Sequence, residues 1–538
     1  MKKALILFGG FMMAFFLLGC QSVTSSTLPT TASIVTTTLS PTTPSSTTTL
    51  PSTSFSTQME STTDLTTVST TPLITLDAPA DLSVSENVID FSPVENALKY
   101  RIKVRHILTE TISYYNITDG FNLRLILSDG SYAIAIMTTG VAPYQDSAYS
   151  DEILVTISDP NQISTLEEED LENYQFIRWS GRTAVDELND SVKFYFTASG
   201  FEVGFYGTQC SARILASKTD IAKYQPILSI FLDGEENPLE ATDLILDAAD
   251  KTYTLVSGLE MGYHRLKVLK RSEAIDSNTA LKSLSTDGYF ADPGSPNTLR
   301  FQFIAASSST GYGNLDINGI EGKTTRNSNG LIGFAYLVSY MLDAECSIFA
   351  ASGWGVTRGY NTGGQINTTE NIPNAFDYVG INDTNKVLTD LGKWNVSNYT
   401  PDVIVVNLGT NDFNASGYDS MSAEQKTALE ERFITDYTAF ILKLNNAYPN
   451  AEIIVSYGLM GEALKLGGFT NQIVANAQEV TNKVHVFQME AAGSNQIPYG
   501  SNYHPSVQTH IRVADAMVNF ILQLTDYEKV RNNIVWED

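Results

Sequence analysis

Four residues of the C-terminal half have the side chains and spacing needed to activate a hydroxyl group. Ser307, Gly353 and Asn411 each follow an apolar, strand-like run, and His504 precedes the last helical stretch. A serine becomes a nucleophile when a base lies within hydrogen-bond reach, and the reaction needs hydrogen-bond donors where an oxyanion forms. Ser307 and His504 can supply the nucleophile and the base, while the Gly353 N–H and the Asn411 side chain can supply donors.

The segments around these residues alternate between apolar strands and helices. The run 402–408 is apolar almost throughout, and a helix that begins at residue 423 carries four apolar side chains on one face. Strands buried on both faces and separated by helices predict a parallel sheet in an α/β fold. Such folds bind ligands at the loops that follow the carboxyl ends of the strands, which is where Ser307, Gly353 and Asn411 stand. The predicted strands are 301–304, 346–350, 402–408, 451–457 and 485–489, and the predicted helices include 331–342.

The ordered set of segments resembles the blocks of the SGNH (GDSL-type) hydrolases. Gly409-Thr410-Asn411-Asp412 matches the third block of that family, and His504-Pro505 matches the last. The resemblance implies a three-layer, flavodoxin-like parallel sheet over residues 298–530. It also implies that Ser307 is the nucleophile, that His504 is the general base, and that the oxyanion hole consists of the N–H groups of Ser307 and Gly353 with the Asn411 amide.

The upstream residues make the resemblance closer to carbohydrate esterase family two, deacetylases of plant polysaccharides. The matching segments are Arg178-Trp179-Ser180-Gly181-Arg182, Gly262-Tyr263-His264-Arg265, Leu269-Lys270-Arg271-Ser272-Glu273, and His504-Pro505-Ser506 with His510. The resemblance covers about residues 165–530 and implies a jelly-roll β-sandwich at 165–297. It implies hydrolysis of O-acetyl esters of a carbohydrate through an acyl-serine intermediate. Trp354 and Tyr503 either line the sugar site or pack within the fold.

Two departures from the family pattern bear on activity. The family's Gly-Asp-Ser is Ala305-Ala306-Ser307 here, and Ser501 and Asn502 stand three and two residues before His504, where an aspartate is usual. Some family members resemble this chain in working as a Ser–His pair, with a backbone carbonyl that holds the imidazole. Loss of the orienting acid costs about 10⁴-fold in one well-studied triad. The alternative to an esterase is therefore a catalytically impaired carbohydrate-binding or adhesive surface lipoprotein. The two serines that follow Ser307 remain alternative nucleophiles.

Two strand-rich regions precede the α/β region. Short strands with period-two alternation over residues 76–158 predict a small β-sandwich, and Ala78-Pro79 with the stretch 97–101 resembles a fibronectin type III module. That module is a spacer or a sugar-binding unit, and we favour a spacer because no aromatic platform stands out. Strand patterns over 165–297, with a hairpin signal at Asp233-Gly234, predict the second sandwich.

The N-terminal residues predict export and lipid anchoring. Lys2 and Lys3 precede an apolar run that ends in Leu17-Leu18-Gly19-Cys20, which resembles the lipobox of bacterial lipoproteins. We therefore expect a signal peptide at 1–19, a lipid on Cys20 and a location on the outer face of the cell membrane. Of the 50 residues from 21 to 70, 31 are Ser or Thr, so 20–75 is expected to be an unfolded tether.

The charge and the cysteines exclude several other functions. The 33 basic and 60 acidic side chains give a net charge of −27, so the chain lacks the cations that a nucleic-acid binder needs. That acidity fits an uncharged, acetylated substrate, with the membrane contacted only through the lipid anchor. Cys210 and Cys346 are expected to be buried thiols, with a disulfide as the alternative. Cys and His spacings suggest no metal site, and we expect no cofactor.

Overall fold

The computed structural model describes residues 73–537, except 86, 108, 128–129, 158–162, 172–176, 361–368 and 415–416. The predicted signal peptide, the lipid-bearing Cys20 and the tether up to residue 72 lie outside the described residues. Within the part of the chain that the structure describes, no helix is both long enough and apolar enough to cross a membrane.

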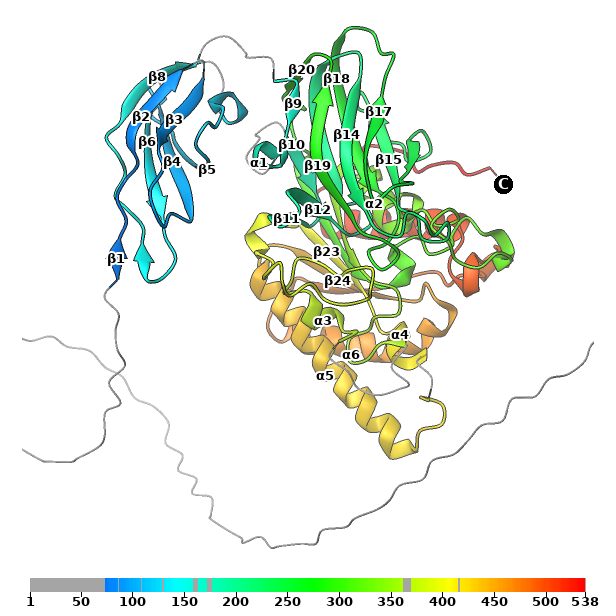
Figure 1. Cartoon of the computed structure of the whole chain (residues 1–538). Coiled ribbons are helices and arrows are strands. Elements are labelled where there is room, and N and C mark those ends of the chain that lie inside the picture. Colours follow the sequence, from blue (N-terminus) through cyan, green and yellow to red (C-terminus); the bar gives the residue numbers. More distant parts are fainter. Residues whose placement is uncertain are drawn as a thin grey trace, which may run out of the picture. The chain divides into compact units, whose positions relative to one another are not determined.

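An all-β module forms first along the described chain (Figure 1). Its main sheet has four antiparallel strands in the order β5-β4-β6-β8, and β2 pairs with β3 beside it. Ile102, Ile134 and Ile136 are fully buried in its core. The fibronectin-like label stays a prediction. The strands are β1 (Ile74–Thr75), β2 (Ala80–Ser85), β3 (Val88–Ser92), β4 (Lys99–His106), β5 (Ile112–Ile117), β6 (Gly130–Thr139), β7 (Tyr144–Gln145) and β8 (Ile153–Ile157).

Two antiparallel sheets form the second β region, and their inner side chains share one core. One sheet has the order β10-β13-β18-β15-β16 and the other β11-β12-β19-β14-β17, with β20 and β9 at their sides. Val203 and Leu266 of the first sheet pack with Ala212 and Leu284 of the second, which confirms the predicted sandwich. The jelly-roll label stays a prediction. The strands are β9 (Thr165–Leu166), β10 (Ile177–Ser180), β11 (Thr183–Asp186), β12 (Ser191–Phe194), β13 (Gly200–Gly207), β14 (Cys210–Ala216), β15 (Ile227–Leu232), β16 (Thr242–Ile245), β17 (Asp250–Val256), β18 (Gly262–Lys270), β19 (Thr279–Thr286) and β20 (Tyr289–Ala291).

The last region is a five-stranded parallel sheet with helices on both faces, as predicted (Figure 1). Its order, β22-β21-β23-β24-β25, is the 2-1-3-4-5 order of flavodoxin-like folds. Neighbouring residues of β21 enter different cores: Phe303 packs with α2 and α7, and Ile304 packs with α5 and α6. The elements are β21 (Leu299–Ala305), α2 (Phe334–Met341), β22 (Ala344–Ala350), α3 (Ile372–Ala375), β23 (Val403–Asn407), α4 (Thr410–Asn414), α5 (Ala423–Ala447), β24 (Glu452–Tyr457), α6 (Gly467–Gln478), β25 (Val484–Gln488) and α7 (Val507–Leu524).

The strand register brings the ends of three strands together. Ala305 at the end of β21 pairs with Ala350 of β22 and with Asn407 of β23. The segments that carry Ser307, Gly353 and Asn411 therefore begin side by side at one edge of the sheet, as the sequence predicts.

The two cysteines of the folded regions are free thiols. Cys210 lies in β14 and Cys346 in β22, and both are buried and unpaired with each other. Burial raises the pKa of each thiol to about 12. They are thus packing residues, and the alternative of a disulfide is wrong.

Candidate active site

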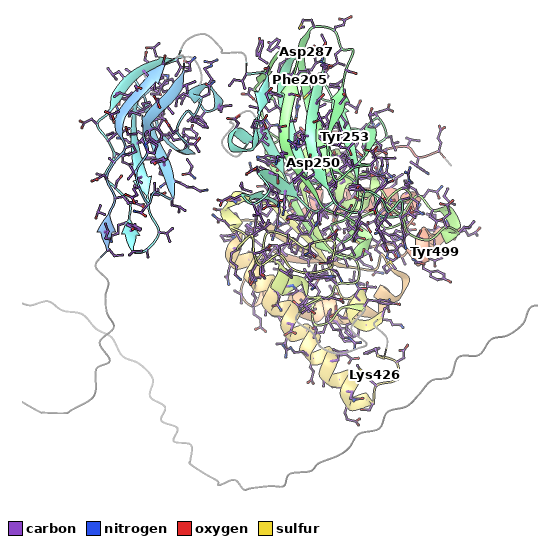
Figure 2. All side chains as sticks on the ribbon, in the orientation of Figure 1. Phe205, Asp250, Tyr253, Asp287, Lys426 and Tyr499 are labelled. Atoms are coloured by element: carbon purple, nitrogen blue, oxygen red, sulfur yellow. The ribbon has the colours of Figure 1, made fainter. Side chains whose placement is uncertain are left out.

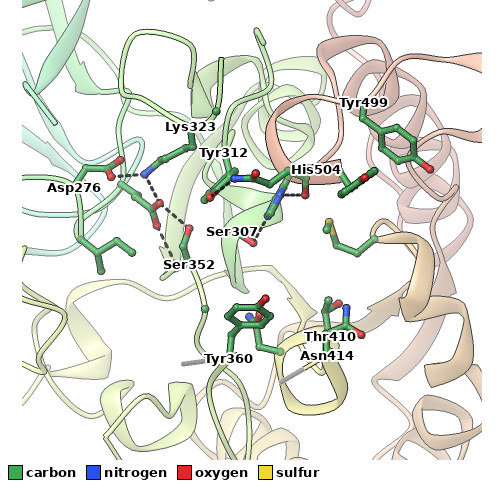
Figure 3. A pocket seen from close by; sticks show the side chains of 18 of the residues that line it. Asp276, Ser307, Tyr312, Lys323, Ser352, Tyr360, Thr410, Asn414, Tyr499 and His504 are labelled. Atoms are coloured by element: carbon green, nitrogen blue, oxygen red, sulfur yellow. Dashed lines mark hydrogen bonds and ion pairs between the residues drawn. The ribbon is translucent and has the colours of Figure 1, made fainter. Parts of the chain in front are cut away.

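Ser307 and His504 form a hydrogen-bonded pair at the carboxyl edge of the sheet (Figure 3). The Ser307 Oγ lies 2.8 Å from the His504 Nε2. Burial lowers the pKa of His504 to about 4, so the imidazole is neutral at neutral pH and its Nε2 can accept a proton. The geometry and the protonation state are those of a nucleophile and its general base.

Backbone carbonyls and an aromatic ring hold the other side of the imidazole. His504 Nδ1 lies 3.2 Å from the carbonyl oxygens of both Ser501 and Asn502. The ring of Tyr312 stacks on the imidazole, with 4.0 Å between ring centroids and an interplanar angle of 19°. Carbonyls can only accept, so Nδ1 carries the proton and Nε2 is left free as the base.

The expected oxyanion donors lie in the same cleft as this pair. Ser307, Gly353, Asn411 and His504 all line it. Gly353 has φ +82°, a left-handed conformation that favours glycine. The Asn411 amide donates one N–H to the Trp354 carbonyl at 2.8 Å, and its second N–H remains to donate to an oxyanion.

A buried ionic cluster supports the loop that carries Gly353. Glu273, from the β-sandwich, accepts hydrogen bonds from both the N–H and the hydroxyl of Ser352 and pairs with Lys323 at 2.8 Å. Lys323 also contacts Asp276. Burial acts to raise the pKa of Glu273, yet the Lys323 charge and these hydrogen bonds bring it below its ordinary value. Burial raises the pKa of Asp276.

A second carboxylate ties two strand-end loops together. Asp412 is fully buried and accepts hydrogen bonds from the N–H groups of Val356, Thr357 and Arg358, at 3.0, 2.7 and 3.1 Å. Burial raises the pKa of Asp412 to about 6. The loop after β22 is thereby fixed to α4, the short helix after β23 that carries Asn411.

The cleft is large enough for several sugar rings. It is open, has a volume of about 1510 Å³, and is lined by both the β-sandwich and the α/β region. Lys218, Lys223 and Tyr224 contribute from the sandwich, and Tyr360, Tyr499 and Tyr503 from the α/β region. An aromatic, polar-lined cleft with a Ser–His pair at its base suits acyl transfer on a bulky polar substrate.

Comparison with known proteins agrees with this geometry. The model of the carbohydrate esterase 2 N-terminal domain matches residues 179–293, and that of the GDSL-like lipase/acylhydrolase domain matches residues 285–517. The chain is homologous to the family two carbohydrate esterases. These two domain matches show that the chain is a carboxylic ester hydrolase.

Two curated relatives and one solved structure illustrate the homology. Cellulase/esterase CelE of Acetivibrio thermocellus is 27% identical over 67% of this chain, which spans only 40% of CelE. An acetylxylan esterase / glucomannan deacetylase of Cellvibrio japonicus is 24% identical over 65% of this chain and 89% of its own length. The structure of a family two carbohydrate esterase from Clostridium thermocellum in complex with cellohexaose has a TM-score of 0.55 at 25% identity, covering 65% of this chain and 98% of that one.

The structure decides between the alternatives that the family resemblance leaves open. Ser308 donates to the Asn407 side chain at 3.1 Å and Ser309 is fully buried, so Ser307 is the serine that meets His504. Trp354 is fully buried and donates its indole N–H to Asn385 at 2.5 Å, so it packs within the domain and does not line the cleft. Tyr503 is 76% exposed and lines the cleft.

Sequence reasoning did not assign roles to the supporting carboxylates of this esterase domain. Glu273 lies in a segment that matches the family, but nothing in its local pattern indicates that it binds Ser352. Asp412 directly follows Asn411 in the block that matches the family, and this position is the sequence feature that could have indicated its supporting role. Both carboxylates accept hydrogen bonds from backbone N–H groups that are far away in the sequence. Local sequence patterns do not indicate such long-range contacts.

Proposed function

We propose that this protein removes O-acetyl groups from a polysaccharide or oligosaccharide at the cell surface. The observation that carries the proposal is the 2.8 Å contact between Ser307 Oγ and His504 Nε2 inside the cleft. The names of the Cellvibrio relatives, acetylxylan esterase / glucomannan deacetylase, support acetyl groups on plant glycans as the substrate. The structure with cellohexaose supports a glycan chain in the cleft.

The residues of the cleft act in two half-reactions. Ser307 Oγ attacks the acetyl carbonyl carbon while His504 Nε2 takes the hydroxyl proton. The resulting oxyanion accepts hydrogen bonds from the N–H groups of Ser307 and Gly353 and from the Asn411 amide. The C–O bond to the sugar then breaks, and the departing sugar oxygen takes the proton from His504. Water then attacks the acyl carbon while His504 Nε2 takes its proton; the bond to Ser307 Oγ breaks, Oγ takes the proton from His504, and acetate leaves.

The cell-surface location rests on the N-terminal sequence. A lipid on Cys20 with the Ser/Thr-rich tether to residue 75 would hold the enzyme at the outer face of the membrane, and the first β module would act as a spacer. Incorporation of labelled palmitate into the full chain, lost in Cys20→Ala, tests this part by itself.

Acetate release tests the activity. Wild-type protein should release acetate from acetylated xylan and from 4-nitrophenyl acetate, and Ser307→Ala should lose at least about 10³-fold in kcat, as in other enzymes with a serine nucleophile. Ser308→Ala is a matched control, because this neighbouring serine contacts Asn407 and not His504. Equal acetate release by wild type and Ser307→Ala would refute the proposal.

A second function is favoured by one observation, the lack of a carboxylate at the imidazole. The His504 Nδ1 contacts recorded within the described residues are backbone carbonyls. A glycan-binding surface protein with an impaired esterase domain would retain the cleft without the reaction. Binding of acetylated xylan to wild-type protein without turnover of any acyl ester would establish this alternative.

A further inference from the structure

A buried carboxylate lies directly behind the loop that holds the catalytic imidazole. Asp316 Oδ2 accepts a hydrogen bond from the Ser501 hydroxyl, with 2.6 Å between the two oxygens, and the two residues are 185 positions apart in the sequence. The same carboxylate accepts hydrogen bonds from the N–H groups of Ile320, Glu321 and Gly322 at 3.1 to 3.2 Å. Asp316 is only 5% exposed, and both of its carboxylate oxygens accept hydrogen bonds from protein donors.

Ser501 is the residue through which this carboxylate reaches His504. Its carbonyl oxygen lies 3.2 Å from His504 Nδ1, and its N–H donates to the Gly313 carbonyl at 2.9 Å. A Cβ at Gly313 would lie 2.2 Å from the Ser501 Cβ, so this close approach requires glycine. Ser501 is therefore held by its hydroxyl on Asp316 and by its backbone on Gly313.

The loop between Ser501 and His504 needs such anchoring because its backbone is strained. Asn502 and Tyr503 both have left-handed conformations, with φ of +51° and +62°. A left-handed conformation is unfavourable for a residue with a side chain and persists only where the surroundings impose it. Without a fixed Ser501, the loop could relax and move the carbonyl away from Nδ1.

We propose that Asp316 is a positioning residue that replaces the missing orienting acid, acting on His504 through the hydroxyl and the carbonyl of Ser501. In a Ser–His–Asp triad the carboxylate accepts a hydrogen bond from Nδ1–H directly and so fixes the tautomer. Here the carbonyls of Ser501 and Asn502 accept that hydrogen bond, and Asp316 fixes the position of Ser501. This inference rests on the proposed esterase function and names a residue of the same site.

The hydrogen bonds of Asp316 distinguish this role from simple loop packing. A residue that only shaped the 320–322 turn would affect stability and leave the imidazole unchanged. Burial acts to raise the pKa of Asp316, but the bonds from Ser501 and the three N–H groups bring it below its ordinary value, so the group is a carboxylate at neutral pH. An asparagine has one acceptor oxygen, so it cannot serve all four donors.

The test compares Asp316→Asn with a matched control in full-chain protein. On 4-nitrophenyl acetate, kcat should fall roughly 10–100-fold, the size seen when the groups that orient a metal-bound histidine are removed, with KM within about twofold. Asp287→Asn is the control, because Asp287 accepts the N–H and hydroxyl of Thr208 and the N–H of Gln209 away from the cleft. A fall in kcat no larger than that of Asp287→Asn would overturn the proposal.

A double-mutant cycle shows whether Asp316 acts through Ser501. Ser501→Ala removes the same hydrogen bond from its other end, so Asp316→Asn/Ser501→Ala should have a kcat no lower than the worse single variant. Multiplicative losses would overturn the proposal. If Asp316→Asn does not fold, Ser501→Ala decides alone: a reduced kcat at unchanged KM supports the role, and wild-type kcat overturns it.

Nitrogen-15 NMR of histidine-labelled protein gives a readout that needs no activity. The His504 signals, assigned by their loss in His504→Gln, should show one neutral tautomer with the proton on Nδ1 in wild type and a mixture in Asp316→Asn. An unchanged tautomer in Asp316→Asn would overturn the inference. An inactive wild type with this tautomer change would refute the esterase function and still support the positioning role.

Discussion

Glu273 of the second β-sandwich binds Ser352 of the α/β domain twice, accepting its N–H at 3.0 Å and its hydroxyl at 2.6 Å. Ser352 directly precedes Gly353, whose N–H we propose as one of the oxyanion donors. The two domains are therefore joined at the catalytic centre itself, and the sandwich is part of the machinery that places a donor.

Glu273→Gln should lower kcat more than its effect on stability explains. The variant leaves Lys323 with Asp276 as its acidic partner and weakens the hold on Ser352, so the Gly353 N–H loses its fixed direction. We expect a loss of about tenfold, below the roughly 10²–10³-fold of deleting an oxyanion donor. Steady-state kinetics on 4-nitrophenyl acetate, with the melting temperature measured in parallel, checks this.

The matched control for this prediction is Glu202→Gln. Glu202 is a buried sandwich carboxylate paired with Arg178 and Arg265, away from the cleft. Both variants should lose stability, because each removes one charge from a buried ion pair. Equal losses of kcat in the two variants would show that Glu273 has no specific effect on the site.

The pH dependence of kcat/KM should reveal the lowered pKa of His504. The imidazole acts as a base only when neutral, so activity is lost as the pH falls through its pKa, which is about 4. Full activity should therefore persist to about pH 5, well below the value of an exposed histidine. An acid limb centred near pH 6.5 in wild type would contradict this prediction.

Substitution of Tyr312 should shift the acid limb of the pH profile of kcat/KM. Its ring covers the imidazole, and the Lys323 ammonium lies 5.3 Å from the centre of that ring. Tyr312→Ala should expose His504 to water, so its pKa and the midpoint of the acid limb should rise above 4. The shift is measured from kcat/KM between pH 3.5 and 8 in both proteins.

Tyr503 should contribute to glycan recognition and not to the chemistry. It is 76% exposed in the cleft, and its ring meets that of Tyr499 edge to face at 5.5 Å. Tyr503→Ala should reduce kcat/KM on acetylated xylan by roughly 2–10-fold, the value of one aromatic contact, and leave 4-nitrophenyl acetate hydrolysis within twofold. Tyr263→Ala, an exposed tyrosine outside the cleft, should change neither rate.

The sheet of the α/β domain could be predicted well from the sequence because its strands are buried on both faces. The predicted runs 402–408 and 451–457 differ by a residue or two from β23 (Val403–Asn407) and β24 (Glu452–Tyr457). Helix α5 also begins at the predicted residue, since Ser422 and Gln425 form a capping box there. The predicted helix 331–342 begins with a 3₁₀ turn instead, and α2 starts only after Gly333.

The support of the active site could not be predicted in the same way. Ser307, Gly353, Asn411 and His504 follow from the order of the strands, because parallel strands bring successive loops to one edge. The bond from Ser501 to Asp316 joins two polar residues whose neighbours show no periodic pattern. Such contacts depend on loop conformations that only the assembled fold defines.

Arg182 should be a main determinant of the stability of the joined domains. Arg182 is 1% exposed, and its guanidinium lies 4.2, 4.3 and 4.9 Å from the ring centres of Phe349, Phe376 and Trp394. It donates to the carbonyls of Phe376 and Tyr378 at 2.8 and 2.6 Å. A sandwich residue is thus buried among rings and carbonyls of the α/β domain.

Arg182→Lys should lower the free energy of unfolding by about 2–4 kcal/mol. Lysine keeps the charge but has no flat guanidinium to stack on three rings while donating to two carbonyls. Urea unfolding followed by fluorescence should show a lower midpoint. Arg178→Lys is the control, because Arg178 lies in β10, just before Arg182 in the sequence, and lysine keeps the positive charge of its salt bridge to Glu202. The control should lose less than about 1 kcal/mol, and equal losses in both variants would show that stacking on these rings does not hold the domains together.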